Sequence, residues 1–152
     1  REMGVREVFH KVAIKPGKPI FIGRLGEKWI FGLPGNPVSA AVTARIFLRL
    51  VMARMQGLGT GLPQRIQVPL DGDLKPVNHR STFVAGRWVN SAGKRCVEPV
   101  RTMGSGDSIH HAQGNTLIFR PVGSEAASNG QSVEVWLTDE ASWEKGKGNY
   151  GG

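Results

Sequence analysis

The first sixty residues alternate between short apolar runs and tight breaks before one long uninterrupted stretch. Three of the runs have the length and composition of strands, at residues 8–14, 20–23 and 29–33. Pro16-Gly17-Lys18-Pro19 separates the first run from the second, and a turn at Gly26-Glu27 joins the second to the third. Pro34-Gly35-Asn36-Pro37 then stops the chain abruptly.

The stretch from Val38 to about Gln56 contains no glycine or proline and predicts a helix. Asn36 is a suitable N-cap, and Pro37 suits the first helical turn. Glycines at 57, 59 and 61 and Pro63 predict its end. The spacing predicts a buried face of Val38, Ala41, Val42, Phe47, Val51 and Met55, with Arg45, Arg49 and Gln56 on the other side.

The pattern changes in the second half to short β-prone runs separated by turn residues. The runs are residues 65–69, 81–89, 95–100, 116–120 and 132–137. Such spacing predicts a small, mostly antiparallel sheet or partly open barrel. Residues 139–152 are polar and glycine-rich and predict a disordered tail.

The chain is therefore expected to divide near residue 60. Residues 1–60 predict an α/β fragment, and residues 61–138 a small all-β, barrel-like domain. The first part has too few strands to close a core alone, so it should need further partners. The length of 152 residues allows one ordinary domain, or a small domain plus part of another.

Charge narrows the class of ligand. The net charge is +8, and the first 28 residues carry half of it, with seven basic against three acidic residues. A basic balance favours an anionic partner. No run of Lys or Arg appears and aromatic residues make up only 7%, which favours a small anion over nucleic acid.

The remaining composition gives no sign of an oxidising compartment. Cys96 is the single cysteine, so no internal disulfide forms, and it suits a small buried position. No apolar run approaches the roughly 18 residues of a membrane span, and no signal peptide opens the chain. A cytoplasmic protein, or a piece of one, is expected.

Lysines on the first predicted strand form one candidate site. On an extended strand Lys11 and Lys15 face the same way, with Cα atoms roughly 13 Å apart. Two ammonium groups at that spacing could hold separated anionic groups of one ligand, and Lys18 could add a third charge. The alternative is three surface lysines on a solvated edge.

The turn from the third strand into the helix forms a second candidate. A helix N-terminus presents free N–H groups and a dipole that favours negative charge. Ser39, in the first turn, could hydrogen-bond a phosphate or cap the helix. The alternative is a plain structural turn.

Two motifs give the chain a resemblance to a known family. Lys15-Pro-Gly-Lys-Pro19 and Phe31-Gly-Leu-Pro-Gly-Asn-Pro-Val-Ser39 resemble, in order and spacing, the signature of the MoeA and gephyrin E-domain family. Weaker similarity continues to about residue 137. The resemblance implies the C-terminal part of a molybdopterin-binding, MogA-like α/β domain followed by the family's barrel-like C-terminal domain.

The resemblance also implies an activity. Members of the family are molybdopterin molybdenumtransferases, which insert molybdenum from molybdate into adenylylated molybdopterin, release AMP and use Mg²⁺; they usually form homodimers. By position, Lys11 and Lys15 match lysines implicated in activity. The expected substrate-binding residues are Lys18, Pro34, Gly35, Asn36, Pro37, Ser39 and Ser105.

The chain also departs from the family pattern. Ala85-Gly86 stands where the family usually has Arg-Gly, and Arg87 follows it. The family's acidic and glycine-rich molybdopterin-binding motifs are expected upstream of Arg1, so no protein ligand for a metal is assigned here. Two alternatives stay open: a non-catalytic scaffold module of the gephyrin type, and a piece without independent activity.

Overall fold

The computed structural model describes residues 4–59, 61–91, 93–101, 111 and 113–137. The chain divides into two compact units, the first spanning Arg1–Leu62 and the second beginning at Pro63. Each unit is described by itself. The predicted tail at 139–152 lies outside the described residues.

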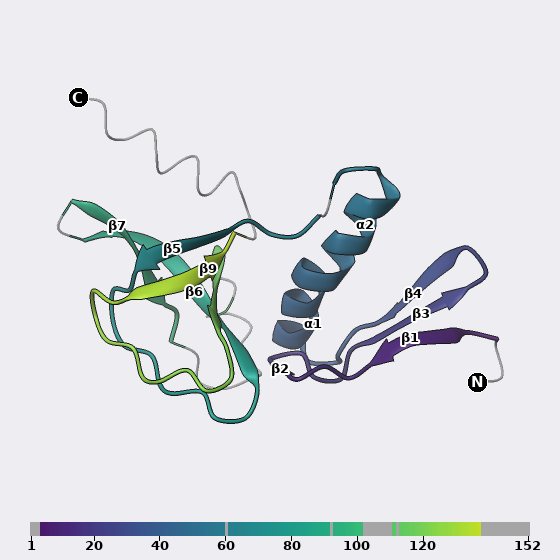
Figure 1. Ribbon diagram of the computed structural model, residues 1–152, viewed down its shortest axis with the longest axis horizontal. Helices are drawn as coiled ribbons and strands as arrows, with labels where there is room; N and C mark the ends of the chain where they lie inside the picture. Colours follow the sequence, from purple (N-terminus) through teal and green to yellow (C-terminus); the bar gives the residue numbers. More distant parts are fainter. Residues whose placement is uncertain (1–3, 60, 92, 102–110, 112, 138–152) are drawn as a thin grey trace. The chain divides into compact units, whose positions relative to one another are not determined.

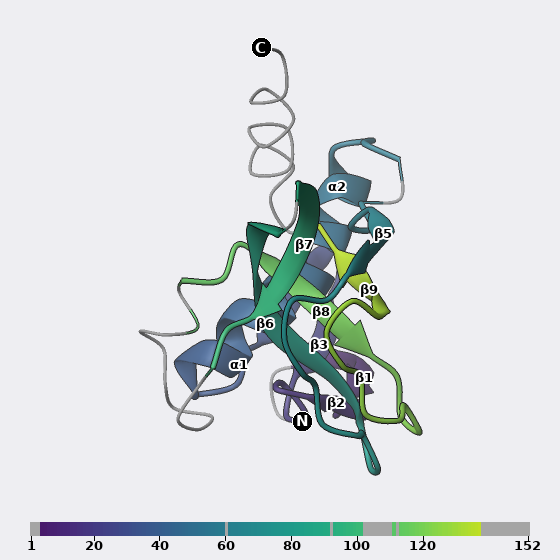
Figure 2. The same cartoon turned by 90° about the vertical axis from the view of Figure 1, so that its left-hand side faces the viewer.

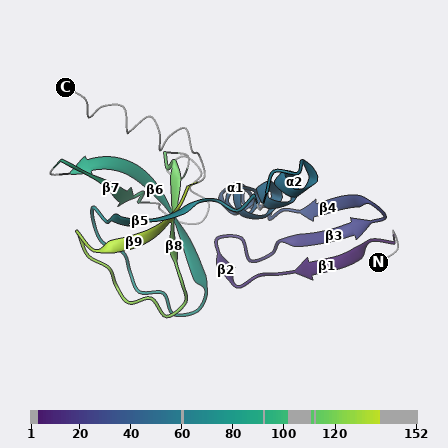
Figure 3. The ribbon, with the colours of Figure 1, turned by 45° about the horizontal axis from the view of Figure 1, so that its top comes forward.

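The first unit is built on a three-stranded antiparallel sheet. Its strands are β1 (Arg6–His10), β3 (Phe21–Leu25) and β4 (Lys28–Gly32), in the order β1-β3-β4. Figure 3 shows the three strands side by side. A two-residue strand, β2 (Ile14–Lys15), lies in the connection between β1 and β3. All three predicted strands are present, but the first ends at His10 instead of Ile14.

The predicted helix is present as one continuous run with an irregular centre. It consists of α1 (Pro37–Thr43), the π-helical segment η1 (Ala44–Leu48) and α2 (Arg49–Met55) (Figure 1). The junction residues Ala44 and Arg49 keep right-handed helical dihedrals, so the chain does not break. The π segment was not predicted, because apolar spacing does not distinguish it from α-helix.

The helix packs on the sheet with a face that differs from the predicted one. Phe47 lies against Phe9 of β1, with ring centroids 5.6 Å apart. Val38, Val42 and Ile46 are buried. Ala41 and Met55 are exposed, contrary to the prediction, because the buried side follows a four-residue spacing that also takes in polar residues of the first two turns.

The second unit is an antiparallel sheet, as predicted. Its described strands are β5 (Arg65–Pro69), β6 (Ser81–Ser91), β7 (Lys94–Pro99), β8 (Thr116–Arg120) and β9 (Ser132–Trp136). They lie in the order β7-β6-β8-β9-β5, and the long, bent β6 is the strand that pairs with both β7 and β8 (Figure 2). The core of this unit includes Val97, Ile118 and Val135, all fully buried.

The sheet curves without closing into a barrel. The two edge strands approach one another only where Leu70, just after β5, forms an isolated bridge with Val97 of β7. The Asp71 N–H donates to the Val97 carbonyl at 2.9 Å, which continues this contact by one step. The expected barrel-like character therefore takes the form of a curved open sheet.

Cysteine and tryptophan occupy structural positions. Cys96 is buried with 6% exposure, as predicted. Trp29, Trp88 and Trp136 are half-buried, and an arginine guanidinium lies over each indole at 5.1 to 5.5 Å from the ring centroid. These pairs fit packing on sheet surfaces. Within the described residues, no helix has both the length and the apolar character needed to cross a membrane.

Candidate anion-binding site

The register of the first sheet brings both candidate segments to one end. His10 is paired with Phe21, and Phe21 is paired with Gly32. The end of β1, the start of β3 and the end of β4 therefore lie at the same end of the sheet. The connection at residues 11–20, here called the lysine loop, and the turn at residues 33–36 lie at this end.

The lysine loop does not continue the strand, and backbone hydrogen bonds join its two ends. The Lys11 N–H donates to the Ile20 carbonyl at 2.9 Å, and the Val12 N–H donates to the Lys18 carbonyl at 3.0 Å. Lys11 itself has φ +66°, in the left-handed region that side chains other than glycine rarely adopt. The prediction that Lys11 and Lys15 share one face of an extended strand is therefore wrong.

The three lysines of this loop are nevertheless all exposed. Lys11, Lys15 and Lys18 each present their side chains to solvent. Within the described part of the chain, no carboxylate lies within ion-pair distance of their ammonium groups. The loop therefore carries three positive charges without ion-pair partners among the described residues, within eight residues of chain. Such a group favours binding of an anion.

The lysine loop is held against the helix at Gly17. A Cβ at this position would lie 2.4 Å from Thr43 Cγ2, which is too close for any side chain. Thr43 is fully buried and donates from Oγ1 to the Ser39 carbonyl at 2.8 Å. Gly17 and Thr43 were not identified from the sequence. From the sequence, the Pro16-Gly17 pair indicates only a turn in which glycine permits a positive φ.

The turn into the helix has the predicted cap. Asn36 precedes Pro37, the first helical residue, and its Oδ1 accepts a hydrogen bond from the Ser39 N–H at 3.1 Å. This bond occupies one of the N–H groups expected to be free for a ligand. Ser39 is buried, with 8% exposure, which fits the capping role better than open access.

The other predicted binding residues differ in accessibility. Pro34 is buried, whereas Pro37 is exposed. Gly35 is exposed, and a Cβ added there would meet no heavy atom within 4 Å. Gly35 therefore leaves open space at the end of the sheet. Ser105 lies outside the described residues.

The described residues contain no cluster of side chains typical of a protein metal site. No group of three or more His, Cys, Asp or Glu side chains gathers anywhere in the part of the chain that the structure describes. Mg²⁺ takes oxygen ligands, chiefly carboxylates. The lysine loop and the turn after β4 offer ammonium and amide groups instead.

In the second unit, Arg87 is engaged by a neighbouring strand. Its guanidinium lies 2.6 Å from a carboxylate oxygen of Glu98, the residue opposite it in β7. Ala85, at the position where an arginine was expected, is buried. Arg87 therefore carries a charge that Glu98 already neutralises.

The second unit also contains an open pocket of about 570 Å³. It lies beside β8 and β9 and includes Arg120, whose side chain is only 6% exposed. Arg120 was not identified from the sequence as a functional residue. The sequence feature that could have indicated it is a charged residue directly after the apolar run Leu117–Phe119 of strand β8, Thr116–Arg120.

Two known families match the two units of the chain. Residues 1–54 match a family described as a probable molybdopterin binding domain, and residues 67–138 match the MoeA C-terminal region (domain IV). The fold class is thus an α/β fragment similar to a probable molybdopterin binding domain, followed by a β-rich unit similar to the MoeA C-terminal region.

Individual proteins similar to this chain carry names that agree with the two family matches. Molybdopterin molybdenumtransferases of Haemophilus influenzae and Staphylococcus aureus (strain COL) are 33% and 27% identical over 129 and 132 residues, or 84% and 87% of this chain. A crystal structure of a molybdopterin biosynthesis MoeA protein from Pyrococcus horikosii superposes with a TM-score of 0.74 over 91% of this chain, at 25% identity.

A molybdenum cofactor biosynthesis protein from Pyrococcus furiosus superposes with a TM-score of 0.69 at 26% identity, covering 88% of this chain and 46% of that protein. Both units of the chain are thus similar to parts of MoeA proteins. The chain spans about a third of the length of the curated relatives it matches, 32% in both cases named above.

Proposed function

We propose that this chain supplies the lysine-bearing wall of a site that inserts molybdenum from molybdate into adenylylated molybdopterin, with release of AMP. The observation that carries the proposal is the gathering of three exposed lysines and the Asn36-capped helix start at one end of a sheet, in a chain similar to parts of MoeA proteins.

The chemistry of the ligands suits these groups. Adenylylated molybdopterin carries a pyrophosphate, and molybdate is an oxyanion. Ammonium groups and a helix N-terminus both stabilise such charges. In the proposed reaction Lys11 and Lys15 neutralise the negative charge that collects on the departing AMP phosphate, and Lys18 helps to hold the pyrophosphate. The chain's contribution is positioning and charge neutralisation.

The turn after β4 has a shaping role in this proposal. Pro34 and Pro37 set its course, Gly35 leaves room for the ligand to approach the backbone, and Asn36 and Ser39 hold the helix start in place. Ser105 is proposed as a further contact. The described residues contain no group of three or more potential metal ligands, and no step of the proposal runs through Mg²⁺.

The proposed setting is the cytoplasm, and the proposed assembly is a homodimer. Both extend the family relationship to this chain, since MoeA relatives are enzymes of cofactor synthesis. Neither affects the roles assigned to the lysines.

Molybdate-dependent AMP release tests the function. In the protein that carries this chain, Lys11→Ala and Lys15→Ala should each lower the rate by about 100-fold, the usual effect of removing one group that stabilises developing charge. Lys28→Ala is the matched control, because Lys28 is exposed and pairs with Leu25 at the opposite end of the sheet. Unchanged turnover in both loop variants would refute the assigned roles and favour a scaffold module.

A further inference from the structure

The second unit contains a buried positive charge that the proposed reaction does not use. Arg120 ends β8, is paired with Thr82 of β6, and is 6% exposed. Its guanidinium donates to the backbone carbonyl of Glu125. Among the described residues, it has no carboxylate partner.

A guanidinium has five N–H donors and cannot lose its charge at physiological pH. Burying such a group without a counter-charge is costly, and a carbonyl oxygen offsets only part of that cost. Desolvation accordingly lowers the pKa of Arg120 from its usual value, a shift that disfavours the charged form. An incoming anion would restore the missing counter-charge.

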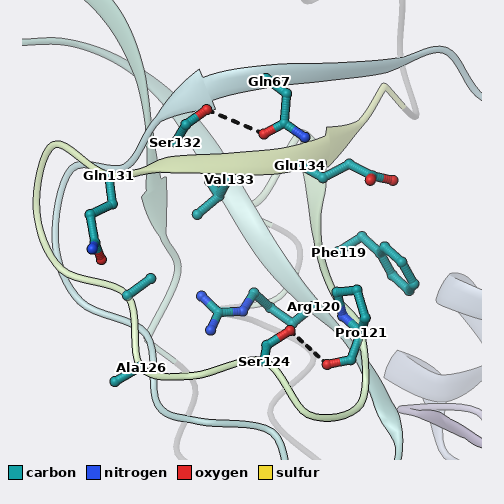
Figure 4. A pocket seen from close by; sticks show the side chains of 11 residues that line it. Gln67, Phe119, Arg120, Pro121, Ser124, Ala126, Gln131, Ser132, Val133 and Glu134 are labelled. Atoms are coloured by element: carbon teal, nitrogen blue, oxygen red, sulfur yellow. Dashed lines mark hydrogen bonds between the residues drawn. The ribbon is translucent and has the colours of Figure 1, made fainter.

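The surroundings of Arg120 leave room for that anion. Its side chain lines the open pocket, and Figure 4 shows the guanidinium between Ser124 and Val133, in the middle of the residues that surround the cavity. The volume of about 570 Å³ is within the range of small-molecule sites.

The polar groups around the pocket are mostly neutral and partly anchored. The Ser124 hydroxyl donates to the Pro121 carbonyl at 2.7 Å, and the Ser132 hydroxyl donates to Gln67 Oε1 at 3.2 Å. Gln131 Oε1 accepts from the Ser128 N–H at 2.6 Å. Each of these side chains keeps donor or acceptor capacity for a ligand.

Among the described residues that line the pocket, the acidic one is Glu134, and it has a hydrogen-bond partner of its own. The Glu134 carboxylate accepts a hydrogen bond from Trp136 Nε1 at 2.7 Å. No ion pair joins it to Arg120 in the described structure. The pocket therefore presents a guanidinium without an ion-pair partner among the described residues, beside neutral hydrogen-bonding groups and the Glu134 carboxylate that is bound to Trp136.

We propose that this pocket binds the oxyanion group, phosphate or carboxylate, of a small molecule, with Arg120 as the residue that recognises it. The planar fork of a guanidinium matches either group through two parallel hydrogen bonds. The residues that line this pocket all belong to the second unit, whereas the lysine loop belongs to the first.

The test is an NMR titration of the 152-residue chain with inorganic phosphate and, separately, acetate, at constant ionic strength. The expected result is a saturable shift of the Arg120 Nε–H signal and of the Ser124 and Gln131 amides. Arg120→Met should weaken binding about tenfold or more. Lys94→Met, which removes an exposed charge from β7, should bind as the wild type does. The anion that binds more tightly identifies the ligand as a phosphate ester or a carboxylate.

A second variant keeps the test decisive if Arg120→Met does not fold. Gln131→Glu retains the acceptor for the Ser128 N–H but adds a negative charge to the pocket, so it should weaken phosphate binding. Shifts that do not saturate, or that are equal in the wild type and both pocket variants, would overturn the proposal. Lys15→Ala should leave these titrations unchanged, which separates this site from the proposed active site.

Discussion

Gly17 is the residue at which the lysine loop packs closely against the helix. It has φ +115°, and a Cβ there would collide with Thr43 Cγ2. Gly17→Ala should therefore lower the free energy of unfolding by about 1–3 kcal/mol. Urea denaturation followed by circular dichroism measures this change.

Gly35→Ala is the control at the residue scale. Gly35 is not among the glycines with positive φ, and open space surrounds its Cα, so the substitution should change stability by no more than about 0.5 kcal/mol. Equal unfolding midpoints for Gly17→Ala and the wild type would contradict the packing of the loop on the helix.

At this scale the roles of the predicted site residues stay predictions, and the backbone conformation of the lysine loop was not predicted. The lysines and the Pro34–Pro37 turn were identified from their motifs, and all three lysines are exposed. The left-handed backbone of Lys11 was missed, because a lysine gives no local signal for positive φ. The contact between Gly17 and Thr43 joins residues 26 positions apart, which no local pattern reveals.

At the scale of elements, the start of the helix is stabilised by a cap and is also part of the proposed anion site. Asn36 caps α1 through its Oδ1 atom. Asn36→Ala should cost about 1 kcal/mol of stability. Asn36→Asp keeps an acceptor at the same place and should preserve stability, but its negative charge should weaken binding of an anion at the helix start.

Measurements of unfolding and of adenylylated molybdopterin binding on the same variants distinguish the loss of the helix cap from the effect of the added negative charge. The account predicts that Asn36→Asp separates them, with stability retained and affinity reduced. If Asn36→Asp binds the ligand as tightly as the wild type, then the helix start lies away from the anion.

The elements themselves were largely predictable. Strands β5 and β8 have the predicted limits, because turn residues bound short apolar runs on both sides. The first strand was predicted four residues too far, since loose alternation continues past His10 although the backbone turns at Lys11. The buried face of the helix was partly wrong, because Thr43 and Ser39 are buried through local hydrogen bonds that apolar spacing does not detect.

At the scale of the whole molecule, charge and family relationship point to the same kind of ligand. The net charge is +8, and half of it falls in the 28 residues that include the lysine loop. The two family matches cover both units. The predicted domain limits, 1–60 and 61–138, stay predictions, although the two compact units divide at Leu62.

The central claim is that the lysine loop binds the anionic substrate. Calorimetric titration of the chain with adenylylated molybdopterin tests it most directly, comparing the wild type, Lys11→Ala, Lys15→Ala, Lys18→Ala and Lys28→Ala. The account predicts that each loop variant binds about tenfold more weakly, while Lys28→Ala binds as the wild type does. Equal affinities for the loop variants and Lys28→Ala would contradict it.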